Sequence, residues 1–296
     1  MRFMMLIKAN KDSETGAMPD AAALAEMGKY NEELCKAGIM LTGDGLHASS
    51  AGFRLRNERG TISVVDGPFA ETKELIAGFW MLDVKSREEA IEWARRVPLL
   101  SADTPQLELR QVMELDDFPV DENESGWREQ ELELRGGVPD GPLGATAKPD
   151  DGARRYRYMF IVKANVDSEA GALPNEQMLT DMGNLMAEMA TSGVLIGGEG
   201  LAPSSKGARI HFKNGKRAVI DGPFAETKEL IAGYCMTQVK SREEALEWAS
   251  RMVKVQGHGE LEVRRMIDAE DFSAETIAQV PEIFEAERQF RERAAH

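Results

Sequence analysis

The stretch Asp66-Gly67-Pro68-Phe69-Ala70-Glu71-Thr72-Lys73-Glu74-Leu75-Ile76-Ala77-Gly78 decides the fold, because the same thirteen letters return at residues 221–233. The two occurrences lie 155 positions apart (221 − 66 = 155), and that offset aligns the flanking sequence in both directions. A fixed internal repeat identifies the structural unit before any other signal does. The chain is therefore one unit written twice.

Each unit carries strand and helix signals in the same order. In the first unit, the apolar run at residues 2–9 predicts a buried strand, and apolar residues at helical spacing after Pro19 predict a helix. Two short segments around Gly60 predict a hairpin, and Ser86 opens a capping box that predicts a second helix. The second unit has the same signals at equivalent positions.

This order reads β-α-β-β-β-α-β, a ferredoxin-like split βαβ unit with one additional strand. Helices would cover one face of such a sheet and leave the other face apolar and in need of a cover. The second unit of the same chain provides that cover. The predicted fold class is α+β, with two ferredoxin-like units forming an intramolecular dimeric α+β barrel.

The repeat also sets the predicted domains. The copies span 1–118 and 156–272, an acidic helical tail and Gly/Pro-rich linker span 119–155, and a C-terminal helical tail spans 273–296. Residues 114–133 hold nine acids against one base. This segment is either a solvated surface or a binding tail.

The bulk composition, with 42% hydrophobic and 29% charged residues, is that of a globular protein. A net charge of −15 argues against nucleic acid or an anionic membrane as the main partner. The N-terminal apolar run is broken by Lys8 and is too short for a signal peptide, and no run approaches the ~18 residues of a membrane span. Cys35 and Cys235 fall at non-equivalent places in the repeat, which predicts unpaired thiols in a cytoplasmic protein.

Asp66 and Asp221 are the candidate catalytic residues. Each follows a strand that we expect to be buried and precedes Gly-Pro, so its pKa could be raised enough for a role as proton acceptor. The alternative is an Asx turn, in which the carboxylate accepts backbone N–H groups and holds the corner.

Candidate ligand-binding residues recur in both units. They could hold an anionic ligand in a central cleft, or they could be surface ion pairs and solvated strand edges. They are Lys73, Lys228, Glu71, Glu226, Arg54, Arg209, Lys8 and Lys163. The Gly-acid-Gly turns at Asp44 and Glu199 lack the length and lysine of a phosphate-binding loop and are expected to be structural. No residue spacing suits a metal ion, and no cofactor is predicted.

The repeated DGPF…ETKE string, the Lys8-Ala9-Asn10 segment and the Glu-x-Arg strand at Glu108 resemble the YCII-related, or DGPF-domain, family. That resemblance implies a dimeric α+β barrel. It implies little about activity, because most members look like proteins without an assigned reaction, often encoded near extracytoplasmic-function sigma factors. A few relatives act on small aromatic or lactone compounds.

Other relatives use a His–Asp pair in a cleft. The four histidines of this chain fall at unrelated repeat positions, which argues against a His-dependent acid–base mechanism; they are His47, His211, His258 and His296.

Two functions remain open at this point. One is a small-molecule-binding protein that takes an acidic or phenolic ligand between the sheets, with acid–base chemistry of lyase or isomerase type. The other is a non-catalytic regulatory protein whose acidic tails contact a partner such as a sigma factor. In both, the chain is a pseudo-dimer that could form a further homodimer.

Overall fold

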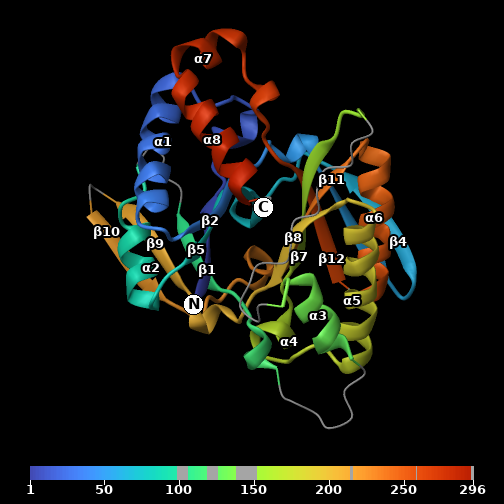
Figure 1. Ribbon diagram of the computed structural model, residues 1–296. Coiled ribbons are helices and arrows are strands. Elements are labelled where there is room, and N and C mark those ends of the chain that lie inside the picture. Colours follow the sequence, from blue (N-terminus) through green and yellow to red (C-terminus); the bar gives the residue numbers. More distant parts are fainter. Residues whose placement is uncertain (99–105, 119–125, 138–151, 214–215, 258, 295–296) are drawn as a thin grey trace.

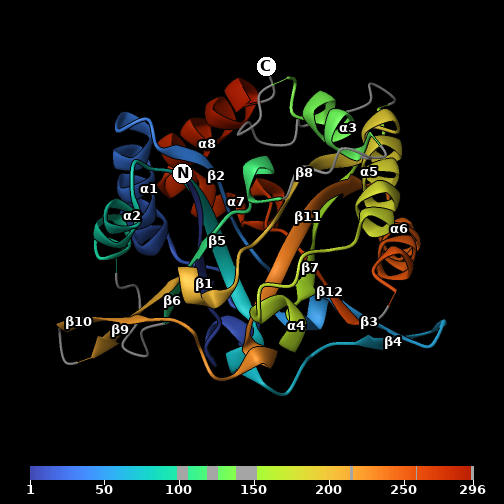
Figure 2. The same cartoon turned by 90° about the horizontal axis from the view of Figure 1, so that it is seen from below.

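The computed structural model describes residues 1–98, 106–118, 126–137, 152–213, 216–257 and 259–294. It consists of two six-stranded sheets that face each other, with helices on their outer faces (Figures 1 and 2). The linker expected around residues 138–151 lies outside the described residues, as do residues 119–125 of the acidic tail.

The two units have matching elements. The first has β1 (Arg2–Lys8), α1 (Ala21–Lys36), β2 (Met40–Gly45), β3 (Phe53–Glu58), β4 (Thr61–Asp66), β5 (Ile76–Asp83), α2 (Arg87–Ala94) and β6 (Leu107–Gln111). The second has β7 (Tyr156–Lys163), α4 (Val166–Glu169), α5 (Glu176–Thr191), β8 (Leu195–Gly200), β9 (Ala208–Lys213), β10 (Lys216–Asp221), β11 (Ile231–Val239), α6 (Arg242–Val255) and β12 (Gly259–Arg265). Within the described residues each unit thus has six strands. The predicted order has five, so it was wrong by one strand.

In each unit, the two strands beyond the four of a ferredoxin-like unit form a hairpin. This hairpin joins the sheet of the other unit. The sheet orders are β10-β9-β6-β1-β5-β2 and β4-β3-β12-β7-β11-β8. Hairpin β3–β4 joins the second sheet, where Phe53 pairs with Val263, and hairpin β9–β10 joins the first, where Ile210 pairs with Leu107. Figure 2 shows both hairpins reaching the opposite half of the molecule.

Apolar side chains from both units fill the space between the sheets. They include Met4 and Phe79 from the first unit and Met159 and Met236 from the second, all almost fully buried. The sheets also join at two corners through the bridges Leu46–Met266 and Val112–Leu201. Each unit therefore covers the other's apolar sheet face, and the chain forms an intramolecular dimeric α+β barrel.

The segments after each unit also cross to the other unit. Helix α3 (Trp127–Leu134) packs on α5, whereas α7 (Ala274–Gln279) and α8 (Pro281–Ala294) pack on α1. The contacts are close, because a Cβ on Gly183 of α5 would meet the Gln130 side chain of α3. No helix within the described ranges is long and apolar enough to cross a bilayer.

Candidate functional site

The aspartates of the DGPF motif lie on the exposed edges of the exchanged hairpins. Asp66 and Asp221 are 71% and 73% exposed and pair with Arg242 and Arg87, which begin α6 and α2. Each ion pair joins the two units. The premise of a buried strand end was wrong, because β4 is an edge strand that is largely exposed on both faces.

Other residues of the motif also have structural contacts. A Cβ on Gly67 would overlap the Ser49 carbonyl oxygen, so only glycine fits there. The Ser49 hydroxyl accepts the Phe69 N–H at 3.0 Å, and the Phe69 ring lies 4.1 Å from the Arg54 guanidinium carbon. The second copy of the motif makes the same contacts around Ser204. The motif therefore fixes the hairpin that bridges the units.

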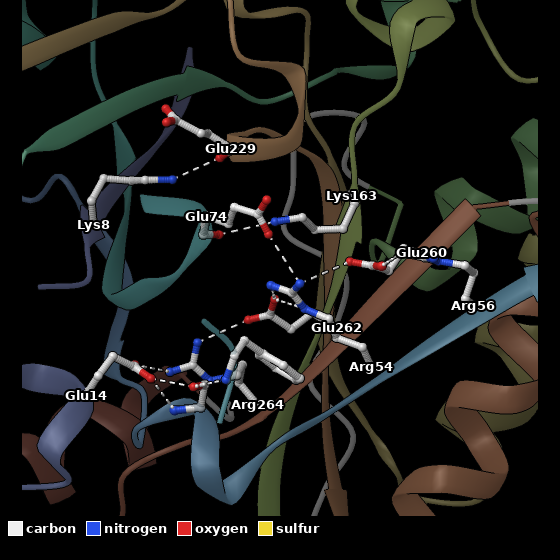
Figure 3. Close-up of polar contacts among 12 residues, drawn as sticks. Lys8, Glu14, Arg54, Arg56, Glu74, Lys163, Glu229, Glu260, Glu262 and Arg264 are labelled. Atoms are coloured by element: carbon white, nitrogen blue, oxygen red, sulfur yellow. Dashed lines mark hydrogen bonds and ion pairs between the residues drawn. The ribbon is translucent and has the colours of Figure 1, made fainter. Parts of the chain in front are cut away.

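Arg54 belongs to a buried ionic network that combines both units (Figure 3). Its Nε donates to Glu262 at 2.9 Å, and one terminal nitrogen contacts Glu74 at 3.2 Å. On the far side of Glu262, Arg264 donates at 3.1 Å and continues to Glu14 at 3.4 Å. Glu262 and Arg264 are almost completely inaccessible.

A second network repeats this arrangement with the units exchanged. Arg209 donates to Glu108 at 2.8 Å and pairs with Glu229 at 3.3 Å. Arg110 contacts Glu108 at 3.4 Å and Glu169 at 3.1 Å. Arg54 and Arg209 are thus neither solvated strand-edge residues nor free cations, because glutamates surround both.

Two of the four lysine candidates, Lys8 and Lys163, belong to these networks. Lys8 donates to the Glu229 carbonyl oxygen at 2.9 Å, and Lys163 donates to that of Glu74 at 3.2 Å. Burial lowers the pKa of Lys8 to about 8 and also lowers the pKa of Lys163. Burial alone would raise the pKa of Glu262, but Lys163 and two arginines hold it below the usual range.

The Gly-acid-Gly segments are structural, but the predicted turns are wrong, because both segments belong to paired strands, β2 and β8. Their acids have a role that the sequence did not reveal. Glu199 is buried between Arg2 of the first unit and Arg135, which contacts it at 2.8 and 3.1 Å. Asp44 is held in the same way, by Arg157 at 2.9 Å and Arg291 at 2.7 Å. The arginines come from strands and tails that the repeat alone could not bring together.

A cavity of about 1130 Å³ is lined mainly by the second unit, and the exchanged hairpin of the first unit and helix α3 complete its lining. One wall is formed by Met178, Met182 and Met186 of α5. Facing strands contribute Gly198 and Gly233, which have no side chain to fill the space. The cavity extends from beneath α5 to the polar end of the barrel, where the first network lies. The expected cleft between the sheets is instead filled by side chains.

Some of the predicted ligand-binding residues line the cavity. Those that line it are Arg54, Lys163, Lys228 and Glu71. The other candidates are not among its lining residues in the described parts of the chain; they are Asp66, Asp221, Lys73, Glu226, Arg209 and Lys8. The sequence carries no distinct signal for the methionine wall, because methionines at helical spacing also occur in ordinary hydrophobic cores.

The structure contains a His–Asp pair. A comparison of equivalent positions in the two units could not reveal it. His47 Nε2 lies 2.8 Å from Asp271, and Arg265 holds the other carboxylate oxygen at 2.6 Å. The equivalents of this pair are Ala202 and Asp117, so it has no counterpart in the repeat. Neither His47 nor Asp271 is among the lining residues found for the cavity.

The fold and its exchanged hairpins define a tandem, pseudo-two-fold α+β-barrel protein. The family model "YCII-related domain" matches residues 1–116 and 156–270, so the chain belongs to the YCII-related domain family and carries two copies of the domain.

An uncharacterised protein of Rhizobium meliloti (strain 1021) is 32% identical over 104 residues, which cover 34% of this chain and 84% of that protein. Among solved structures, chlorite dismutase from Candidatus Nitrospira defluvii in complex with imidazole aligns over 96% of this chain and 93% of its own, with 11% identity and a TM-score of 0.37. A mutant of that enzyme in complex with cyanide gives 9% identity and a TM-score of 0.35, covering 98% and 93% of the two chains.

Proposed function

We propose that this protein binds one small, largely apolar molecule with a phenol-type hydroxyl group in the cavity of the second unit. The observation that carries this proposal is the cavity itself. Its volume of about 1130 Å³ is large enough for a small molecule, and its lining joins the methionine wall to a region of charged residues that includes Arg54, Glu74 and Lys163. Methionine side chains adapt well to ligands of varied shape.

The charges around the cavity favour a phenol over a carboxylic acid. Arg54 is paired with Glu74, Glu260 and Glu262, so its charge is already compensated. A ligand carboxylate there would meet Glu74 and Glu260, which line the cavity with Arg54. Lys163 donates one N–H group to the Glu74 carbonyl oxygen. Another N–H group of the same amine can donate to a ligand hydroxyl.

Acid–base chemistry of lyase or isomerase type, if the protein has it, would depend on Lys163 in this proposal. Its lowered pKa increases the neutral fraction of the amine near pH 7, which is the form that accepts a proton. The two motif aspartates are exposed and ion-paired, and we assign them no part in it.

Binding of 2-naphthol, measured by its fluorescence, tests the proposal against 2-naphthoic acid, which has the same rings and a carboxylate. We expect 2-naphthol to bind more tightly and Lys163→Met to weaken it about tenfold, the value of one hydrogen bond. Lys8→Met is the matched control, because Lys8 is the equivalent residue outside the cavity lining. Failure of both compounds to bind would end the proposal, and tighter binding of the acid would overturn the phenol preference.

The alternative of a regulatory protein with a sigma-factor partner gains no specific support. Arginines of both tails bond carboxylates of this chain, through Arg135 with Glu199 and Arg291 with Asp44. Deletion of residues 273–296 would therefore disturb the barrel itself and could not isolate a partner contact.

A further inference from the structure

The two units differ at one position that faces the helices. Trp80 on β5 and Cys235 on β11 are equivalent in the repeat (235 − 80 = 155). They also have the same strand neighbours, because Trp80 pairs with Gly43 and Cys235 with Gly198. Both side chains lie in the core between sheet and helices. A large aromatic ring in one unit is thus replaced by a small thiol in the other.

In the first unit the indole of Trp80 fills this space. Its Nε1 donates to Asn31 Oδ1 at 2.8 Å, and its ring meets the Tyr30 ring edge-to-face at 5.5 Å. A Cβ added at Gly43 would lie 2.7 Å from the indole Cδ1. The glycine leaves room for the ring, and Asn31 satisfies its one polar atom.

In the second unit the ring and its polar partner are replaced by a thiol and a thioether, which pack together, with Cys235 Sγ 4.0 Å from Met186 Sδ. The equivalents of Asn31 and Tyr30 are Met186 and Leu185. Cys235, Met186 and Gly198 all line the cavity. The glycine that accommodates the indole in the first unit is therefore retained, whereas the second unit supplies no indole.

We infer that the ring of the ligand displaces the flexible Met186 side chain from Cys235 and occupies in the second unit the place that the Trp80 indole occupies in the first. This inference rests on the proposed function and adds the position of the ring. Met186 offers no good acceptor where Asn31 binds the indole N–H, so the inner end takes an unsubstituted aryl group. The polar group of the ligand then points toward Lys163. In the first unit the Trp80 side chain fills the equivalent place, so within the described residues we expect the ligand ring to have this place in the second unit only.

Two experiments on the full chain test this inference with 2-naphthol as the probe. Cys235→Trp restores the ring that the second unit lacks, and we expect it to weaken binding about a hundredfold, the value of burying one aromatic side chain. Cys235→Ala is the matched control and should change affinity by no more than about twofold, because it adds neither a ring nor a polar group. The expected stoichiometry is one 2-naphthol per chain.

The second experiment needs no variant and covers the case in which Cys235→Trp does not fold. The chain has two free thiols, buried Cys235 and exposed Cys35. Saturating 2-naphthol should slow modification of Cys235 by methyl methanethiosulfonate and leave the rate at Cys35 unchanged. Equal rates at Cys235 with and without 2-naphthol, undiminished binding to a folded Cys235→Trp variant, or two molecules bound per chain would each overturn the inference. No binding to the wild-type chain would instead refute the proposed function.

Discussion

Lys8 and Lys163 are basic residues at equivalent places in the barrel, and Lys8 is the more deeply buried of the two. Lys8 is 5% exposed, and each lysine donates to a carbonyl oxygen of the other unit's ETKE segment. Burial of an amine disfavours its charged form, which is why its pKa falls. The nearest charged groups to Lys8 act in both directions: Glu108 and Glu229 favour the charge, while Lys163 and Arg209 oppose it.

The lowered pKa of Lys8 predicts a pH dependence of stability. Between about pH 8 and 10.5, the values for the folded and the exposed side chain, the unfolded chain binds more protons than the native one. The free energy of unfolding of the wild type should therefore rise with pH across this window relative to Lys8→Met. Urea unfolding at several pH values measures it. Lys29→Met, an exposed control, should run parallel to the wild type, and a parallel Lys8→Met curve would contradict the prediction.

At this scale the sequence identified several residues but not their surroundings. Lys8, Lys163, Arg54 and Arg209 were singled out because both units keep them, and all four lie in the networks. The buried glutamates between the arginines, Glu262 and Glu108, come from the other unit, so no local pattern could reveal that these charges are compensated. Asp66 was misjudged because a strand with β-branched residues looks buried, whereas the exchanged hairpin leaves it at a sheet edge.

The exchanged hairpin is the element that locks the two units together. Gly67 lies against the Ser49 carbonyl oxygen, and the following Phe69 packs on Arg54, which bonds Glu262 of the other unit. The hairpin itself was predictable from its turn and alternation. The sheet that the hairpin joins was not predictable, because the same alternation fits the edge of either sheet.

Gly67→Ala should destabilise the protein by about 3 kcal/mol, because the added methyl group forces the loop away from backbone atoms. Gly222→Ala, at the equivalent position, should cost as much. Ala70→Ser, an exposed change in the same loop, should stay within about 0.5 kcal/mol of the wild type. Urea unfolding monitored by tryptophan fluorescence compares the three. Equal stability of Gly67→Ala and the wild type would show that this close contact is absent.

At the scale of the whole molecule, the two units depend on each other for sheet edges, core and tails. The internal repeat predicted two facing sheets correctly. It could not predict that hairpins and tail helices would both be exchanged. A repeat shows which segments of the two units are similar, but it does not show which unit each segment contacts.

Separately produced halves, residues 1–155 and 156–296, should form a one-to-one complex when mixed. Alone, each half exposes an apolar sheet face and lacks the hairpin that covers its edge strand, β6 or β12. Size-exclusion chromatography with light scattering measures the masses. Either half persisting as a folded monomer with the stability of the intact chain would contradict this expectation.

The difference between Trp80 and Cys235 has a consequence for how such a protein can evolve. In a homodimer every mutation of the gene appears in both subunits, so a side chain that closes one site closes the other as well. A fused pair escapes this constraint. One half can give up its opening to become a scaffold, while its neighbour stays free to change whatever it accommodates.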